Sequence, residues 1–233
     1  MRSFRSSNPV LRRTREYDVV SDTPITYSNV AIKTVFLLTV AVVSAIITMQ
    51  SGVFNLGILF GGMIIGFIAV IVGTRSIRLA PFAGVVYALA EGTVLGFVSA
   101  LYEGFYDNIV ITAVTTTALV FVIMLLLFST KIIKVNQKFA SFMVVALMAV
   151  IVMSLFAIIL PSVFGGEMFM IVVILSSVLS AFFLLLDFQS IQNSVESGMD
   201  QKVGWMLAIG LMVTIVWIYF EMLRLLAVFS RNN

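Results

Sequence analysis

Three carboxylic acids of this chain lie inside long, predominantly apolar segments, where charged residues are rare. They are Glu91, Asp187 and Glu221. A charged group near the centre of a bilayer costs roughly 2.5–3.5 kcal/mol on insertion scales, so such residues usually face a bundle interior, water or a partner. Each acid shares a helical face with small or polar residues, as an interior face would. We therefore take these three acids as the candidate functional residues.

Their chemistry is that of proton and cation binding. Carboxyl groups that share a low-dielectric cavity repel each other when ionised, so their protons become coupled. The chain has no histidine and no cysteine, so a proton switch would depend on carboxylates. Ionised carboxylates are also the hard oxygen ligands that Ca²⁺ prefers. Asp187 and Glu221 are thus the predicted ligands of a weak Ca²⁺ permeation or gating site, and no tightly bound cofactor is expected.

Each acid also has a purely structural interpretation. Glu221 and Arg224 are i, i+3 neighbours and could neutralise each other. Asp187 could pair with Arg75 or Arg78, which lie at the end of the second apolar segment on the same side of the membrane. Glu91 has no cation in its own segment, so it would be protonated or bonded to another helix. The sequence leaves these alternatives open.

The elements that must position these residues are seven apolar segments, each long enough to cross a hydrocarbon core of about 30 Å as a helix. The chain is 61% hydrophobic and 11% charged, far more apolar than a soluble domain. The segments lack the alternation of barrel strands. We predict an all-α integral membrane protein with spans at Val30–Met49, Leu56–Gly73, Leu79–Leu101, Ile109–Ser129, Phe139–Leu160, Met168–Phe188 and Gly204–Phe229.

Basic residues occur in alternate loops between these spans. The second, fourth and sixth spans are followed by loops that contain Arg75, Arg78, Lys131, Lys134, Lys138 and Lys202. The remaining loops contain Glu103, Asp107 and Glu167 and no lysine or arginine. Because basic loops stay on the cytoplasmic side, the N-terminus is predicted to be cytoplasmic and the C-terminus outside.

Two regions follow from this pattern: a basic cytoplasmic tail at 1–28 and a transmembrane domain at 29–233. Positive charge gathers at helix ends, so no nucleic-acid partner is expected.

The glycine pairs Gly57/Gly61, Gly62/Gly66 and Gly92/Gly96 allow close helix contacts. The absence of cysteine and the short loops fit the plasma membrane of a bacterium. The sequence does not define the oligomeric state.

Four stretches of the chain resemble the Bax inhibitor-1 family, also called the transmembrane Bax inhibitor motif family, and most closely its bacterial branch. They are Ser7-Asn8-Pro9-Val10-Leu11, the run from Tyr87 to Gly96 that contains Glu91-Gly92, Leu184-Leu185-Leu186-Asp187-Phe188, and the run from Trp217 to Leu226 that contains Glu221 and Arg224. The four stretches lie at the expected places along nearly the whole chain and are specific as a set.

The resemblance implies a bundle whose last helix is central, wrapped by the other six. It also implies a pH-sensitive Ca²⁺ leak, in which acids of the sixth and seventh helices form a proton-linked pair and an arginine near the end of the second helix competes. By this resemblance, the matching positions in this chain are Asp187 for the sixth-helix acid, Glu221 for the seventh-helix acid, and Arg75 or Arg78 for the competing arginine. On the predicted boundaries the two acids lie about 5–10 Å apart in depth, and Glu91, near the midplane, could bridge them.

Three functions compete. The first is a proton-regulated passive cation leak, with Ca²⁺ as the permeant ion. The second is a stress regulator that transports nothing and binds other membrane proteins, such as a membrane-bound protease, through the tail at 1–28. The third, an intramembrane enzyme, is disfavoured because Ser176, Ser177 and Ser180 have no histidine base in this chain. We expect no enzymatic activity.

Overall fold

The computed structural model describes residues 23–52, 55–160 and 167–231. These residues form seven helices and no strand, and each helix is long and apolar enough to cross a membrane. The fold class predicted from the sequence is thereby confirmed. The helices are α2 (Tyr27–Ser51), α3 (Leu56–Arg75), α4 (Ala80–Glu103), α5 (Ile109–Ser129), α6 (Gln137–Ile159), α8 (Glu167–Glu196) and α9 (Val203–Arg231).

Polar residues at the helix ends explain where several helices begin. Thr26, Asn55 and Asn136 each accept a hydrogen bond from a backbone N–H in the first turn of the following helix, which satisfies a donor that the helix itself leaves unpaired. The carboxylate of Glu103 accepts the amides of Asn108 and Val110 at 2.9 and 3.0 Å. It thus stabilises the start of α5, where the helix dipole favours negative charge.

The sixth predicted span differs most from its helix, because α8 continues from Phe188 to Glu196. Hydrogen bonds between side chains one turn apart accompany this polar extension, from Gln189 to Asn193 and from Gln192 to Glu196. The left-handed Gly198 follows the helix, with a φ of 65°. Hydropathy detects the apolar part of a helix, so the polar end of α8 was missed.

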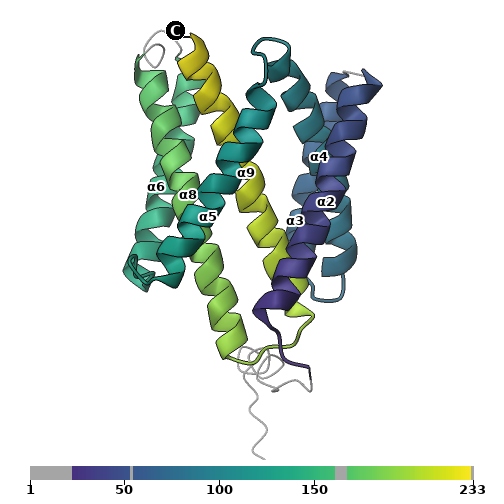
Figure 1. Ribbon diagram of the computed structural model, residues 1–233, viewed down its shortest axis with the longest axis vertical. Coiled ribbons are helices and arrows are strands. Elements are labelled where there is room, and N and C mark those ends of the chain that lie inside the picture. The colour runs from purple at the N-terminus through teal and green to yellow at the C-terminus, as the bar shows by residue number, and fades with distance from the viewer. Residues whose placement is uncertain (1–22, 53–54, 161–166, 232–233) are drawn as a thin grey trace, which may run out of the picture.

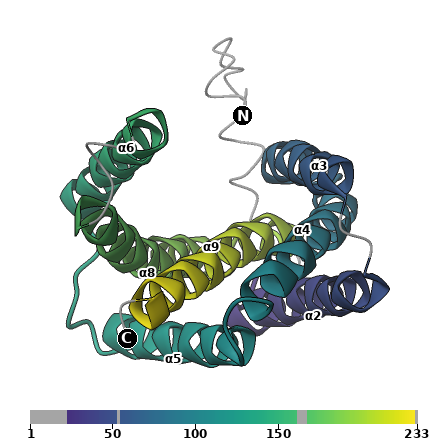
Figure 2. The same cartoon turned by 90° about the horizontal axis from the view of Figure 1, so that it is seen from above.

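The last helix lies between two groups of helices. Figure 1 and Figure 2 show α9 crossing the middle of the molecule, with α2, α3 and α4 toward one side and α6 and α8 toward the other, while α5 crosses α9 between them. Over the described ranges α9 contacts α2, α3, α4, α5 and α8, whereas α6 contacts α8 alone. The central position of α9 agrees with the resemblance, but five helices surround it rather than six.

Two glycines allow α2 and α4 to approach closely. A Cβ atom at Gly92 would overlap the backbone oxygen of Ala41, and one at Gly96 would overlap that of Ala45. The hydroxyl of Ser44 donates to the Leu89 carbonyl at 2.9 Å across the same interface. The Gly92/Gly96 pair therefore makes a contact within the chain, of the small-residue kind expected in membranes.

A short backbone pairing closes one end of the bundle. Pro24 and Asp200 form an isolated antiparallel bridge. The Ile25 amide donates to the Met199 carbonyl at 2.8 Å, and the Gln201 amide donates to the Thr23 carbonyl at 3.0 Å. The segment before α2 is thus fixed to the loop between α8 and α9. We call residues 23–25 and 199–201 the terminal clamp.

Candidate functional site

Glu221 is a buried carboxyl group on the central helix, with 7% of its surface exposed. The Ser176 hydroxyl on α8 donates to its Oε1 atom at 2.5 Å, and the Trp217 indole N–H donates to the same atom at 3.2 Å. The other oxygen, Oε2, is buried and has no hydrogen-bond partner. One oxygen is therefore held by two donors, whereas the other is left for a proton, a cation or a ligand.

Arg224 lies three residues after Glu221 but does not neutralise it. Its guanidinium lies over the ring of Phe169, 4.7 Å from the ring centroid. This is the distance of a cation–π contact. Within the described residues no ion pair joins Glu221 and Arg224, so the static pair that the sequence allowed is not formed.

Glu221 and Arg224 line an open pocket between α6, α8 and α9, and its volume is about 290 Å³. We call it the α6–α9 pocket. One wall consists of α6 residues, and the other carries the polar groups of α8 and α9. The lining residues are Leu147, Val150, Ile151, Ser154, Leu155, Ser176, Trp217, Glu221 and Arg224.

Asp187 lies on α8 and faces the same central helix at a different level. Its Oδ2 atom is buried without a hydrogen-bond partner. The Thr214 hydroxyl of α9 lies within hydrogen-bonding reach of the carboxyl group, although this hydroxyl also has the Gly210 carbonyl as an acceptor at 3.4 Å. Asp187 thus resembles Glu221 in having a hydroxyl neighbour and one unsatisfied oxygen.

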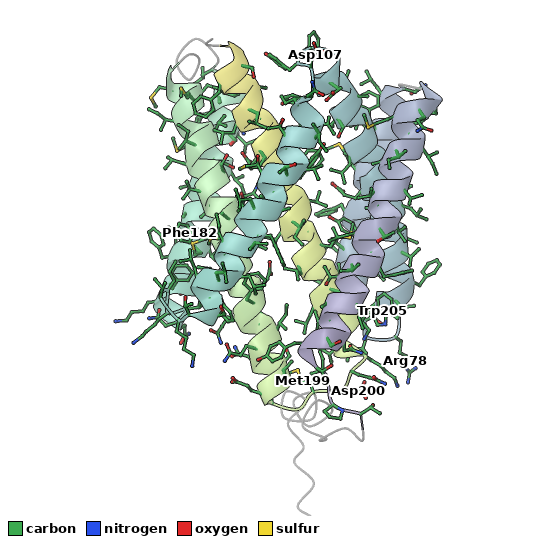
Figure 3. The ribbon with its side chains drawn as sticks, viewed as in Figure 1. Arg78, Asp107, Phe182, Met199, Asp200 and Trp205 are labelled. Carbon is green, nitrogen blue, oxygen red and sulfur yellow. The ribbon has the colours of Figure 1, made fainter. Side chains whose placement is uncertain are left out.

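The predicted cationic partners of Asp187 lie elsewhere. Arg75 and Arg78 lie at the end of α3 and in the loop that follows it. Figure 3 shows Arg78 at the same end of the molecule as Met199 and Asp200 of the terminal clamp. No ion pair between either arginine and Asp187 is present among the described residues. The structure therefore does not bring this predicted group together.

Asp187 and Glu221 do not meet. Ser176, which is bonded to Glu221, precedes Asp187 by eleven residues on α8, and a rise of 1.5 Å per residue separates the two positions by about 16 Å. Buried hydroxyl groups of Ser177 and Ser180 lie on α8 between them. The seam between α8 and α9 therefore carries two carboxyl groups at different depths, with hydroxyl groups between.

Glu91 lies on the other side of the bundle and does not bridge the two levels. Its Oε2 atom would be 3.4 Å from a Cβ atom at Gly66 of α3, and Tyr87 lies beside it. Helix α4 does not contact α8 within the described ranges, because α9 lies between the two groups. The Glu91 carboxyl group therefore lies beside α3 at Gly66.

A joint metal cage of these acids is not preformed. Within the described part of the chain, no group of three or more acidic residues could hold a metal ion. The weak Ca²⁺ site predicted at Asp187 and Glu221 would consist of two separate carboxylates rather than one shared shell of oxygen ligands.

Sequence reasoning missed Lys33, which lies within the first apolar span. Its ammonium group donates to Asn29 at 2.7 Å and to the Gln201 carbonyl at 2.6 Å. It also lies 5.4 Å from the centroid of the Trp205 ring. Asn29, one helical turn earlier, was the available signal, because residues i and i+4 face each other on a helix.

Comparison with protein families agrees with this architecture. The family model described as Bax inhibitor 1 like matches residues 8–231, nearly the whole chain. The chain belongs to the Bax inhibitor 1 like family. A comparison with curated proteins found no match. Family membership agrees with the seven-helix fold and leaves the activity to be argued from the site.

Proposed function

We propose that this member of the Bax inhibitor 1 like family is a proton-regulated passive cation leak, with Ca²⁺ as its permeant ion. The observation that carries the proposal is the seam between α8 and α9. It contains two carboxyl groups, the half-buried Asp187 and the buried Glu221, and each has one buried oxygen without a hydrogen-bond partner. Buried ionisable groups in a membrane helix bundle are typical of ion and proton pathways.

The seam offers weak binding positions in series. A permeant cation must bind well enough to enter and weakly enough to leave, which several weak positions provide better than one strong cage. Asp187 and Glu221 lie at two levels, and Ser177 and Ser180 contribute hydroxyl groups between them. When the carboxyl groups are protonated they no longer attract a cation, so proton binding would close the path.

Flux measurements in proteoliposomes test this proposal. Ca²⁺ efflux is measured from about pH 6 to pH 8 and should be higher at the higher pH, because an ionised carboxylate attracts a cation and a protonated carboxyl group does not. Asp187→Asn and Glu221→Gln remove the negative charge, so each should lower the flux about tenfold or more and flatten its pH dependence. Glu196→Gln is the matched control, because Glu196 is an exposed acid at the end of the same helix as Asp187 and should leave the flux unchanged.

A protein that gives no flux at any of these pH values would contradict the leak. The second candidate function, a regulator that binds other membrane proteins, would then gain support. The feature of the sequence that suggests it is the basic tail at 1–28, which a leak would not need. Deletion of the predicted tail at 1–28, part of which lies outside the described residues, should then alter partner recovery in pull-downs and leave flux unaffected.

The proposed setting is a bacterial plasma membrane with the basic loops in the cytoplasm. The loops with Arg78 and Asp107 lie at opposite ends of the bundle (Figure 3), as seven consecutive spans require. The positive-inside rule then puts the end with Arg78 and the terminal clamp in the cytoplasm. The carboxyl group of Glu221 would lie in the outer half of the membrane.

A further inference from the structure

The α6–α9 pocket contains opposite charges that do not satisfy each other. Glu221 lines the pocket, and the Oε2 atom of its carboxyl group is buried without a hydrogen-bond partner. Arg224 has an aromatic ring, not an acid, beside its guanidinium. The Ser154 hydroxyl also lines the pocket, and it makes no hydrogen bond within the described residues. The pocket therefore offers a negative site, a positive site and a free hydroxyl group.

The opposite wall and the opening of the pocket are apolar. Leu147, Val150, Ile151 and Leu155 of α6 form this wall. Every lining residue belongs to a helix that can span the membrane, and Ser154 and Leu155 lie close to the end of the α6 span at Ala157. Because the pocket is open rather than enclosed, it opens at the level of the bilayer, where the surrounding molecules are lipids.

We propose that this pocket binds the headgroup of a phospholipid that carries both a primary ammonium group and a phosphate. The ammonium group pairs with the Glu221 carboxylate, and the phosphate contacts Arg224 and the Ser154 hydroxyl. The acyl chains lie against the apolar wall of α6. This inference goes beyond the leak activity, and it stands if the protein conducts no cation.

Charge and size both favour such a lipid. An ammonium–carboxylate pair and a phosphate–guanidinium pair leave the site neutral overall, which offsets the cost of placing charges in a low-dielectric region. The two charges of the headgroup are separated by two methylene carbons. Glu221 and Arg224 are one helical turn apart, with Cβ atoms about 5–6 Å from each other. A volume of about 290 Å³ admits a headgroup, with the chains outside.

An anionic phospholipid without an amine fits less well. Its phosphate would neutralise Arg224, but Glu221 would remain a buried charge without a partner, which is unfavourable. The site should therefore distinguish phosphatidylethanolamine from phosphatidylglycerol. The ionised carboxylate makes this distinction, so removal of its charge should abolish the preference.

Tryptophan fluorescence provides the measurement, because the chain has two tryptophans and one of them, Trp217, lines the pocket. In the Trp205→Phe variant, Trp217 is the sole reporter. The full chain is placed in vesicles of equal parts phosphatidylethanolamine and phosphatidylglycerol, with brominated acyl chains on one lipid or the other. Bromine quenches the fluorescence of a tryptophan that it contacts, so the two samples compare occupancy at the pocket.

We expect brominated phosphatidylethanolamine to quench Trp217 roughly three- to tenfold more strongly than brominated phosphatidylglycerol does. This is the preference expected when one partly desolvated ion pair distinguishes the two lipids. Glu221→Gln should bring the ratio to about one, whereas Glu196→Gln should preserve it. In the Trp217→Phe variant, the remaining Trp205 lies by the terminal clamp and should show no preference. Equal quenching of Trp217 by both lipids, the same preference at Trp205, or a ratio that survives Glu221→Gln would overturn the proposal.

A second variant tests the pocket without altering its charges. Ser154→Phe places a ring in the space between α6 and α9, and α6 tolerates it because this helix contacts α8 alone within the described ranges. The preference for phosphatidylethanolamine should disappear while Glu221 and Arg224 are retained. Retention of the preference in this variant would show that the lipid binds elsewhere, which also overturns the proposal.

Discussion

At the scale of single residues, two neighbouring serines illustrate how the site is held. Ser176 and Ser177 are both buried on α8. The Ser176 hydroxyl crosses to Glu221 on α9, whereas the Ser177 hydroxyl bonds the Val173 carbonyl of its own helix at 2.8 Å. A polar group is well satisfied in either arrangement, but only the first joins two helices and fixes the orientation of the carboxyl group.

This contrast gives a stability prediction. Ser176→Ala should lower the free energy of unfolding by about 1–2 kcal/mol, because a buried carboxyl group loses a donor. Ser177→Ala should change it by less than about 0.5 kcal/mol, because the helix retains its backbone bonds. Unfolding in mixed micelles with increasing denaturing detergent measures both variants. Equal losses in the two variants would show that the cross-helix bond contributes nothing.

The acids themselves were predictable from the sequence, but their partners were not. A carboxyl group in an apolar span is conspicuous because it is costly there, so Glu91, Asp187 and Glu221 could be selected by composition alone. Which donor reaches each acid depends on the rotation and depth of helices that are distant in sequence. Ser176 and Glu221 are separated by 45 residues, and no local pattern connects them.

At the scale of elements, the helices approach each other where side chains are smallest. Gly92 and Gly96 allow α2 and α4 to come into backbone contact, whereas a Cβ atom at Gly61 of α3 would have no neighbour within 4 Å. Glycine pairs of the same spacing therefore have different roles. The sequence identified the pairs but not which of them lay in an interface, because helix rotation decides that.

Alanine substitutions distinguish these roles. Gly92→Ala should destabilise the protein by about 1–3 kcal/mol, because α2 must move away from the added methyl group. Gly61→Ala should be neutral or stabilising by up to about 1 kcal/mol, because alanine favours the helix and meets no neighbour. Thermal unfolding in detergent compares the two. A Gly92→Ala protein as stable as Gly61→Ala would contradict the close packing of α2 and α4.

At the scale of the whole molecule, seven consecutive spans put alternate loops at opposite ends. The span count and the fold class followed from hydropathy and loop charge, because both depend on local composition. The isolation of α6 from α9 could not be predicted in this way. It depends on how seven similar apolar surfaces divide their contacts, and lipid satisfies an apolar helix face as well as protein does.

Orientation can be measured directly because the chain has no cysteine. Single cysteines at the exposed positions Asp107 and Arg78 lie on opposite sides of the membrane. A membrane-impermeant maleimide should label Asp107→Cys in intact cells and Arg78→Cys after permeabilisation, if the basic loops are cytoplasmic. Labelling in detergent is the control for reactivity. A reversed pattern would contradict the orientation, and labelling of both from one side would contradict the span count.

The terminal clamp has a consequence for biosynthesis. Lys33 of the first span contacts Gln201, 168 residues later in the chain, and residues 23–25 pair with 199–201. These bonds can form only after six spans have left the ribosome and entered the bilayer. Until then the start of α2 lacks its partner loop, so the first helix to be inserted is among the last to reach its final surroundings.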